Sequence, residues 1–266
     1  MNILVCAKQV PDTTVIKIDP VKHTLIRTGV PSILNTFDTY ALETALRLRE
    51  AEGGTITVIS MGPEQAKAIL RESLSVGAEE VYLISDRAFG GSDTLATSLI
   101  LSTAIELLEK KNGRKFDLVL CGKQAIDGDT GQVGPEIAQH LDRSIVTYAV
   151  QAQMQDGQLR VKRESDEGYD WFSAELPAVV TMNKTSYDMR WPSIKGRKQS
   201  RTAEIPVLTA QDVIVPEDRR GLKGSPTKVK KTYTPVHEKN GMKIEGLAAQ
   251  DAAKKLVELM SAAKLI

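Results

Sequence analysis

The sequence contains little that would build a covalent or metal-bound scaffold. Two cysteines among 266 residues, Cys6 and Cys121, exclude a disulfide framework. They are far apart in the sequence and have no ligand-type neighbours, so we predict no metal site. The histidines lack the spacing of a catalytic triad or a metal site, which predicts surface positions for His23, His140 and His237.

Long apolar runs and a charge excess are also missing. No run approaches the ~18 residues of a membrane helix, so we predict no membrane insertion. A formal net charge of +1 gives no indication of nucleic acid binding. Residues 1–6 form a short apolar run without the basic flank or cleavage site of a signal peptide. We interpret this run as a first buried strand and expect a cytoplasmic protein.

What is present is the composition of a globular protein. A hydrophobic content of 41% and a charged content of 26% allow a substantial core to form. The length suits one large domain, or one domain with an appendage.

Strand and helix patterns alternate through the first half of the chain. Short runs rich in β-branched residues predict strands buried on both faces of a parallel sheet, at 3–6, 55–59, 81–84, 116–121 and 145–150. Helical patterns separate them, at 37–48, from Pro63 to Gly77, from Ser92 or Asp93 to Lys111, and from Pro135 onward. This order predicts an α/β fold with a doubly wound, mostly parallel sheet.

One connection is unusually long. About thirty residues separate the first strand from the first helix, and long connections are often functional. Within it, 15–18 and 24–27 indicate a small hairpin.

The second half of the chain has a different pattern. Residues 158–163 and 169–174 predict an antiparallel hairpin, and 178–181 a further strand. Residues 184–201 are polar and basic and indicate irregular structure, and 221–240 have the composition of an extended arm. A final amphipathic helix is expected at 247–264, with an apolar face that docks on another chain or folds back.

A glycine-rich loop follows the fourth predicted strand. In doubly wound sheets, ligands bind where the strand order reverses. If the strands lie in the order 3-2-1-4-5, the loops after Cys6 and Cys121 face each other. The second loop, 122–135, carries glycines that permit close backbone approach and ends at a helix start that attracts phosphate. The alternative is a surface turn rich in Asp and Gly.

Other polar motifs indicate binding and no acid–base chemistry. Ser92 and Asp93 are interpreted first as a helix cap, with Thr94 and Thr97 as possible cofactor contacts. No residue has the setting of a general acid, a base or a nucleophile. We therefore predict no catalytic residue, and any redox chemistry would belong to a cofactor.

Several segments together match one protein family. The chain resembles the β subunit of electron-transfer flavoproteins along nearly its whole length. The resemblance is carried by residues 5–10 (VCAKQV), 35–38 (NTFD), 60–63 (SMGP), 122–127 (GKQAID), 161–168 (VKRESDEG) and 176–181 (LPAVVT).

The resemblance implies a heterodimer with an α subunit that carries FAD. In the conventional branch of the family the β subunit binds AMP, and in the bifurcating branch it holds a second FAD. There, NADH delivers two electrons, which this flavin splits between a low-potential acceptor, usually ferredoxin, and the α-subunit flavin. The implied organisation is a nucleotide- or flavin-binding domain at 1–224 and a C-terminal arm and helix at 225–266 that dock on the α subunit.

The branch is indicated by the loop at 127–136. It resembles the bifurcating type, because the conventional type tends to have a bulkier acidic residue where Gly128 stands. We therefore predict FAD, with AMP as the alternative. By similarity, the cofactor contacts map to Cys6, Ala7, Asn35, Thr36, Phe37, Asp38, Met61, Thr94, Thr97, Gly122, Lys123, Gln124, Ala125, Ile126, Asp127, Gly128, Asp129, Thr130, Gly131, Gln132 and Val133.

The segment 187–196 resembles the family's partner-recognition loop. An apolar residue there, Ile194 by alignment, would anchor a flavin dehydrogenase, with Trp191 beside it. The dehydrogenase is expected to be of the acyl-CoA or enoyl-CoA type, or else of the lactate type. The alternative is an ordinary solvated loop with Trp191 tucked inward. An unrelated adenine-nucleotide sensor of similar fold would explain neither this loop nor the arm.

Overall fold

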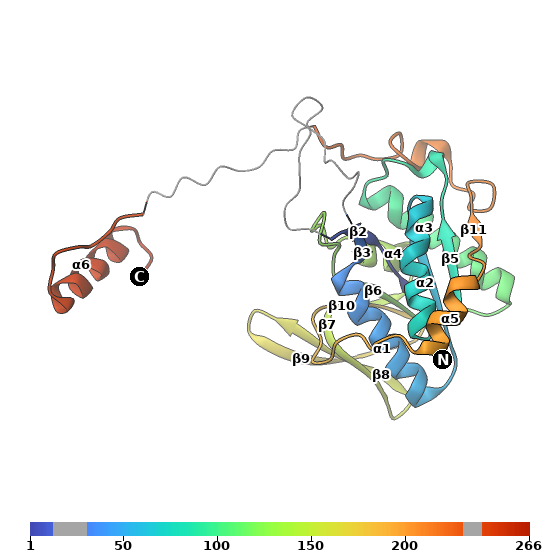
Figure 1. The fold of residues 1–266 in the computed structure, drawn as a ribbon, viewed down its shortest axis with the longest axis horizontal. Helices are drawn as coiled ribbons and strands as arrows, with labels where there is room; N and C mark the ends of the chain where they lie inside the picture. The colour runs from blue at the N-terminus through green and yellow to red at the C-terminus, as the bar shows by residue number, and fades with distance from the viewer. Residues whose placement is uncertain (13–30, 231–240) are drawn as a thin grey trace. The chain divides into compact units, whose positions relative to one another are not determined.

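The computed structural model describes residues 1–12, 31–230 and 241–266 (Figure 1). Residues 1–12 and 31–230 belong to one unit and 241–266 to a second, and each is described by itself. The predicted hairpin at 15–18 and 24–27 lies outside the described residues, as do His23 and His237.

Within the described residues, nine strands form one sheet in the order β11-β5-β4-β1-β6-β10-β7-β8-β9. The strands from β11 to β7 pair in parallel, and β7, β8 and β9 pair antiparallel. The bounds are β1 Asn2–Cys6, β4 Thr55–Met61, β5 Glu80–Ile84, β6 Leu118–Gly122, β7 Ser144–Gln155, β8 Gln158–Ser165, β9 Gly168–Ala174, β10 Ala178–Met182 and β11 Val207–Leu208. Strands β2 Gln9–Pro11 and β3 Ser32–Leu34 form a small antiparallel pair. The predicted α/β fold is confirmed.

The central strands are apolar because both of their faces are covered. Every residue of β1 is buried. Alternate side chains enter opposite cores: Ile3 and Val5 join one hydrophobic cluster, and Leu4 and Cys6 join the other.

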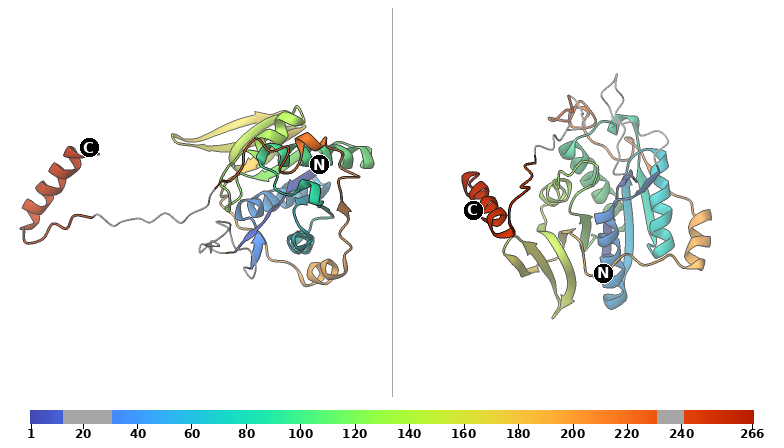
Figure 2. Two further views of the ribbon diagram at one scale, coloured as in Figure 1. Left: turned by 90° about the horizontal axis from the view of Figure 1, so that it is seen from above. Right: turned by 60° about the vertical axis from the view of Figure 1, so that its left-hand side comes forward.

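Helices cover the two faces in pairs (Figure 1 and Figure 2). Helices α1, Thr36–Glu52, and α2, Lys67–Val76, pack on one core. Helices α3, Thr94–Asn112, and α4, Val133–His140, pack on the other. A further helix, α5 at Ile194–Thr202, contacts α2, and α6 at Ala249–Ala262 lies in the second unit. Short 3₁₀ turns occupy Glu64–Ala66, Arg87–Phe89 and Glu217–Arg219.

The helix limits follow the expected signals closely. The Asp93 side chain accepts a hydrogen bond from Ala96 N at 3.1 Å, so this residue caps α3 as predicted. Gly113 ends that helix in the left-handed conformation, with φ of 65°. Pro63 is followed by a 3₁₀ turn before α2, and α4 begins two residues ahead of Pro135.

Two expectations about order are corrected. Residues 145–150 lie in β7, but β10 is inserted between β6 and β7, so the fifth predicted strand is not the neighbour of the fourth. Residues 184–201 are not wholly irregular, because α5 begins at Ile194. This helix buries only Ser200, so its sequence carries almost no apolar periodicity.

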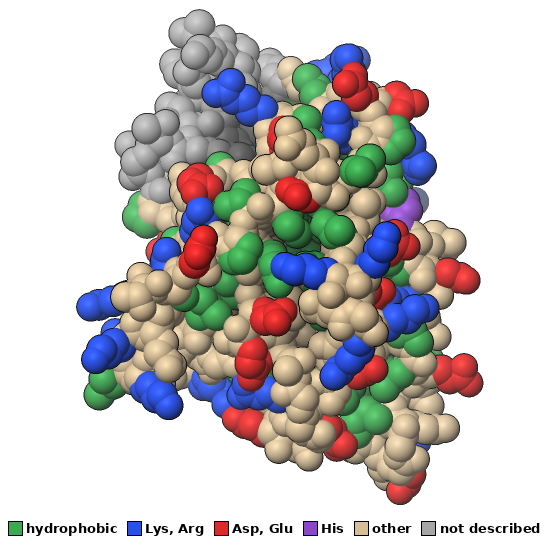
Figure 3. All heavy atoms as spheres, turned by 90° about the vertical axis from the view of Figure 1, so that its right-hand side faces the viewer, with side chains coloured by type: hydrophobic (Ala, Val, Ile, Leu, Met, Phe, Trp, Pro, Cys, Tyr) green, Lys and Arg blue, Asp and Glu red, His purple; other side chains and the backbone are tan. Residues whose placement is uncertain are grey.

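In the view of Figure 3, acidic and basic side chains are mixed over most of the surface, and several Lys and Arg side chains gather at its left edge. None of the described helices has the length and apolar character needed to cross a membrane. His140, predicted at the surface, is only partly exposed, and its buried Nε2 has no hydrogen-bond partner among the described residues.

Candidate functional site

The strand order reverses between β1 and β6. From β1 the chain passes through α1 to β4 on one side, whereas β6 pairs with β1 on the other, with Cys6 opposite Cys121. The loops after these two strands therefore face each other, as predicted. An ion pair of 2.6 Å between Lys8 Nζ and Asp127 Oδ1 joins them.

Asn35 fixes the first half of the glycine-rich loop. Its buried side chain donates from Nδ2 to the Gln124 carbonyl at 2.9 Å and accepts the Ile126 N–H on Oδ1 at 3.0 Å. Both ends of the amide are used, so this part of the loop has a defined backbone course.

Asp38 is a second residue that links the loops after β1 and β6. Its buried carboxylate accepts the Lys8 N–H at 2.7 Å and the Gly122 N–H at 3.1 Å. Burial raises the pKa of Asp38 to about 7, although these backbone hydrogen bonds act to lower it.

Two glycines are required by close packing. A Cβ on Gly122 would lie 2.7 Å from Phe37 Cβ and closer still to the Asp38 carboxylate. A Cβ on Gly134 would lie 2.5 Å from Thr181 Cγ2. Strand β6 and helix α4 can therefore approach their neighbours only without side chains at these positions.

The second half of the loop turns through left-handed residues and then enters α4. Asp129 and Gly131 have φ of 51° and 64°. Gln124 Nε2 donates to Asp129 Oδ1 at 2.7 Å. Gln132, the residue before α4, makes no side-chain capping bond. Among the first residues of α4, Pro135 has no N–H and the Glu136 N–H donates to the Gln132 carbonyl at 3.0 Å, so the N–H groups of Val133 and Gly134 are those without a partner within the helix.

Helix α3 brings Thr94 to the same place. The Thr94 hydroxyl donates to Gln132 Oε1 at 3.0 Å and lies 3.3 Å from Glu136 Oε1. The other Glu136 oxygen is buried and has no hydrogen-bond partner in the described part of the chain. Thr97 lies one turn further along α3 and is partly exposed.

A cation and two aromatic rings lie at the loop's start. Lys123 Nζ is 4.8 Å from the centre of the Phe37 ring and 5.8 Å from that of Tyr148. Tyr148 has φ of 55°, next to an irregularity in the pairing of β7 with β10. Sequence reasoning missed Tyr148, because the approach of β7 to Lys123 depends on the strand order of the sheet and not on a local motif.

Cys6 and Cys121 are neighbours across β1 and β6, and both are buried free thiols. A side-chain hydrogen bond with Cys121 and burial raise the pKa of the Cys6 thiol well above its ordinary value. The buried thiol therefore stays protonated and packs as a small apolar side chain.

The structure brings most of the predicted cofactor residues to one edge of the sheet. Cys6 ends β1 and Ala7 follows it, Met61 ends β4, Asn35 precedes α1 and 36–38 begin it, and 122–133 run from the end of β6 to the start of α4. The pair predicted to recognise a partner lies elsewhere, between β10 and the first residue of α5. There Trp191 is 89% exposed and Ile194 91% exposed, so Trp191 is not tucked inward.

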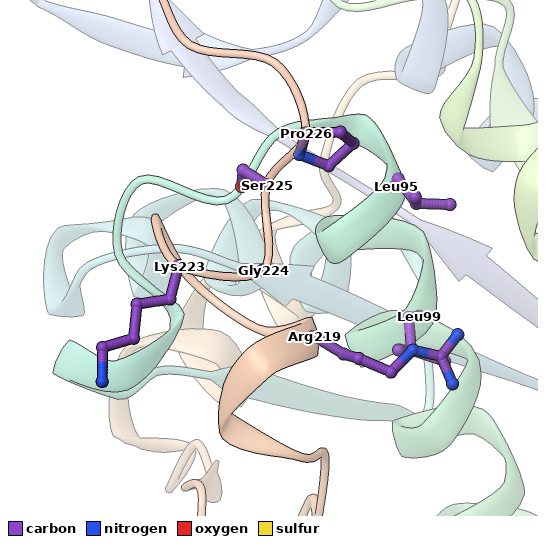
Figure 4. Close-up of a pocket in the computed structure, with 7 residues that line it drawn as sticks. All are labelled: Leu95, Leu99, Arg219, Lys223, Gly224, Ser225 and Pro226. Carbon is purple, nitrogen blue, oxygen red and sulfur yellow. The ribbon is translucent and has the colours of Figure 1, made fainter.

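A separate hollow of about 360 Å³ lies beside α3 (Figure 4). No predicted cofactor residue lines it; its walls are Leu95, Leu99, Arg219, Lys223, Gly224, Ser225 and Pro226. Asp93, the cap of α3, also accepts the Thr227 N–H at 2.9 Å and donates its own N–H to Ser225 Oγ at 2.8 Å. The motif around Asp93 therefore attaches 225–227 to the domain.

The loop site has the features of a nucleotide site. It offers a helix N-terminus, left-handed turn residues and the cations of Lys8 and Lys123. Among the described residues, no group of three or more His, Cys, Asp or Glu side chains could hold a metal ion. The residues present fit a phosphate-bearing cofactor held by the backbone.

Comparison with known proteins agrees with this geometry. The model of the electron transfer flavoprotein domain matches residues 22–213. The chain is 48% identical to the electron transfer flavoprotein subunit beta of Megasphaera elsdenii, over the full length of both proteins. It is 48% identical to the protein of that name from Thermoanaerobacterium thermosaccharolyticum and 43% identical to the Caffeyl-CoA reductase-Etf complex subunit CarD of Acetobacterium woodii, again over both full lengths. The chain belongs to the electron transfer flavoprotein family, as a β subunit.

Proposed function

We propose that this β subunit binds FAD at the 122–133 loop and takes part in NADH-dependent electron bifurcation between ferredoxin and a partner flavin dehydrogenase. The main support for FAD is the space around Gly128. A Cβ at this position would meet nothing within 4 Å and the residue is exposed, so no described side chain fills the outer side of the loop.

Each part of the loop has a separate binding role. Asn35 and Asp38 fix the inner side of the loop and leave its outer side available. The N-terminus of α4 and the side chain of Lys123 would supply positive potential for the diphosphate, whereas the charge of Lys8 is paired with Asp127. Thr94 and Gln132 supply neutral hydrogen-bonding groups.

The chain's contribution is placement and electrostatics. Bound FAD would supply the one- and two-electron chemistry, which no side chain of this site can perform. Lys8, Lys123 and Asp127 are the charged groups that would tune the flavin, because charge near the ring system changes its potential.

The proposed partners follow from the family and from exposed apolar groups. The α subunit would receive the second unit, where Leu256 and Val257 of α6 are about half exposed. This assignment keeps the division into a 1–224 domain and a 225–266 arm. Trp191 and Ile194 would contact the flavin dehydrogenase. The name of the Acetobacterium relative, which includes a Caffeyl-CoA reductase-Etf complex, supports the acyl-CoA or enoyl-CoA type. The cytoplasm is the proposed location.

The second candidate is a conventional carrier with structural AMP. Cofactor analysis of the heterodimer, co-expressed with its α subunit and desalted gently, separates the two. Two FAD and little AMP per dimer are expected. One FAD with one AMP would rule out the bifurcating function and leave the conventional one.

A further inference from the structure

The recognition segment carries an apolar tip between two anchored regions. Trp191 and Ile194 are exposed at its outer end. Met189 and Arg190 before the tip and Gly196 after it are only partly exposed.

The first anchor is a clamp between Arg190 and α1. The guanidinium donates to both oxygens of Glu43, from Nε at 2.9 Å and from Nη2 at 3.0 Å. The Arg190 backbone N–H donates to the same carboxylate at 3.1 Å, and the guanidinium also pairs with Glu50. The clamp therefore fixes the main chain directly before Trp191 as well as the side chain.

The Glu43 side chain is itself held in one place. It is 1% exposed and also accepts a hydrogen bond from Arg47 Nε at 2.8 Å. Burial acts to raise its pKa, but the hydrogen bonds from Arg190 outweigh this and hold the pKa of Glu43 below its ordinary value. The carboxylate is thus ionised at neutral pH, and its pairing with Arg190 is poorly screened by salt.

A second contact supports the clamp. The Tyr187 hydroxyl lies 2.8 Å from Thr44 Oγ1, and the Arg47 guanidinium lies 4.1 Å from the centre of the Tyr187 ring. Residues 187 and 190 are therefore both held on α1.

The second anchor lies after the tip. Ser193 Oγ accepts the Gly196 N–H at 2.9 Å and caps α5. Gly196 packs so closely on the Ser75 carbonyl that no Cβ fits there. Arg71 of α2 donates to the carbonyls of Ser200, at 2.7 Å, and Ala203, at 2.9 Å. Helix α5 is thereby fixed to α2.

We propose that Arg190 is a positioning residue for partner recognition: its clamp on Glu43 and Glu50 holds the 191–194 tip in a preformed, exposed conformation. This rests on the proposed role of Trp191 and Ile194. A tip that is already ordered loses less conformational freedom when the dehydrogenase binds, which increases affinity without any direct contact from Arg190. Lysine cannot replace the planar fork that spans two carboxylates, so the position favours arginine.

The order of the tip can be measured without the partner. The chain has two tryptophans, so Trp171→Phe leaves Trp191 as a single fluorescent reporter. In that background, time-resolved anisotropy of the full β chain, measured before the α subunit is added, should show faster local motion for Arg190→Ala, and an intermediate change for Arg190→Lys. Arg197→Ala, which removes a nearby exposed arginine of α5, should leave it unchanged.

The effect on recognition is measured with a purified acyl-CoA dehydrogenase as electron acceptor. Arg190→Ala should raise the KM for this dehydrogenase on the order of tenfold. The kcat, the flavin content and the assembly with the α subunit should not change. Ile194→Ala should raise KM as well, and the double variant should show less than the product of the two effects.

Three outcomes would overturn the proposal in distinguishable ways. Unchanged anisotropy in Arg190→Ala means that the clamp does not order the tip. A loosened tip with an unchanged KM, while Ile194→Ala raises KM, means that order is irrelevant to recognition. If Ile194→Ala leaves the KM unchanged, the proposed recognition function has failed. The proposal about Arg190 then fails with it, even where the anisotropy confirms the clamp.

Discussion

Asp38 is the residue on which the two loops of the candidate site depend, and its protonation gives a pH signature. Its pKa in the folded protein is about 7, against an ordinary value of 3.8, because burial disfavours the charged form. The folded state therefore holds a proton that the unfolded state has lost between these values. The stability contributed by this group is full below about pH 4 and is lost as pH rises towards 7.

We expect the free energy of unfolding of the wild type, relative to Asp38→Asn, to fall by a few kcal/mol, in order of magnitude, across this pH window. Urea unfolding of both proteins at several pH values measures the difference, from which the other titrating groups cancel. A difference that rises with pH would show that the two backbone hydrogen bonds, and not burial, control this carboxyl.

Gly128 is the residue at which the two cofactor candidates separate. Gly128→Glu should reduce the FAD bound by the β subunit on the order of tenfold, because a carboxylate would occupy the open side of the loop and repel the diphosphate. The fold should tolerate the change, since a side chain there meets nothing within 4 Å.

Gly128→Ala and Gly128→Gln are the matched controls, the first for a minimal side chain and the second for bulk without charge. Cofactor release followed by chromatography gives the FAD and AMP contents. Full retention of FAD in Gly128→Glu would contradict an FAD site on this side of the loop.

The sequence indicates the candidate site where a local motif marks it and not where contacts cross the sheet. The glycine-rich loop was identifiable from its own composition, because turns and helix starts are local structures, whereas 35–38 were mapped only by the resemblance to the family. Tyr148 and the Arg190–Glu43 clamp were not, because their partners lie far away in the sequence. Such pairings are decided by tertiary packing.

At the scale of the elements, the residue that caps helix α3 also holds the segment 225–227. One oxygen of Asp93 accepts the Ala96 N–H of the helix, and the other accepts the N–H and hydroxyl of Thr227. The cap of the helix and the attachment of 225–227 therefore share one side chain.

Asp93→Ala should lower the free energy of unfolding by about 1–2 kcal/mol, since it removes both functions. Asp93→Asn keeps an oxygen for the cap but presents an amide donor to Thr227, so it should release 225–230 with a smaller loss of stability. Limited proteolysis and amide hydrogen exchange of this segment give the measurement. Equal behaviour of the two variants would show that the cap and the attachment are not separable.

At the scale of the whole molecule, the two hydrophobic cores contain none of the described residues of the second unit. A chain that ends at Lys230 should therefore melt within about 2 °C of the full chain. It should form much less heterodimer with the α subunit, because the apolar face of α6 is missing. Thermal unfolding and size-exclusion chromatography test both parts, and a marked drop in Tm would favour the alternative in which the last helix folds back.

The fold class was predictable because buried parallel strands and amphipathic helices leave strong periodic signals. The usual doubly wound order correctly predicted β4 and β6 as the neighbours of β1. It did not predict the position of β10, because this strand pairs with two strands that precede it in the chain and no local motif marks that pairing. Helix α5 was missed for a different reason: it is ordered by its cap and by Arg71, and not by an apolar face.

The insertion of β10 also bears on how the chain folds as it leaves the ribosome. Strand β6 is made early, but its second neighbour emerges only after β7 and the β8–β9 hairpin. Until then β6 is an open, apolar edge, which is the kind of surface that captures other nascent chains. The antiparallel β7–β8–β9 ribbon can form before β10 is synthesised. Pairing of β10 with both β6 and β7 then joins this ribbon to the parallel sheet. Synthesis of the stretch before Ala178 is therefore the interval in which this protein is most exposed to aggregation.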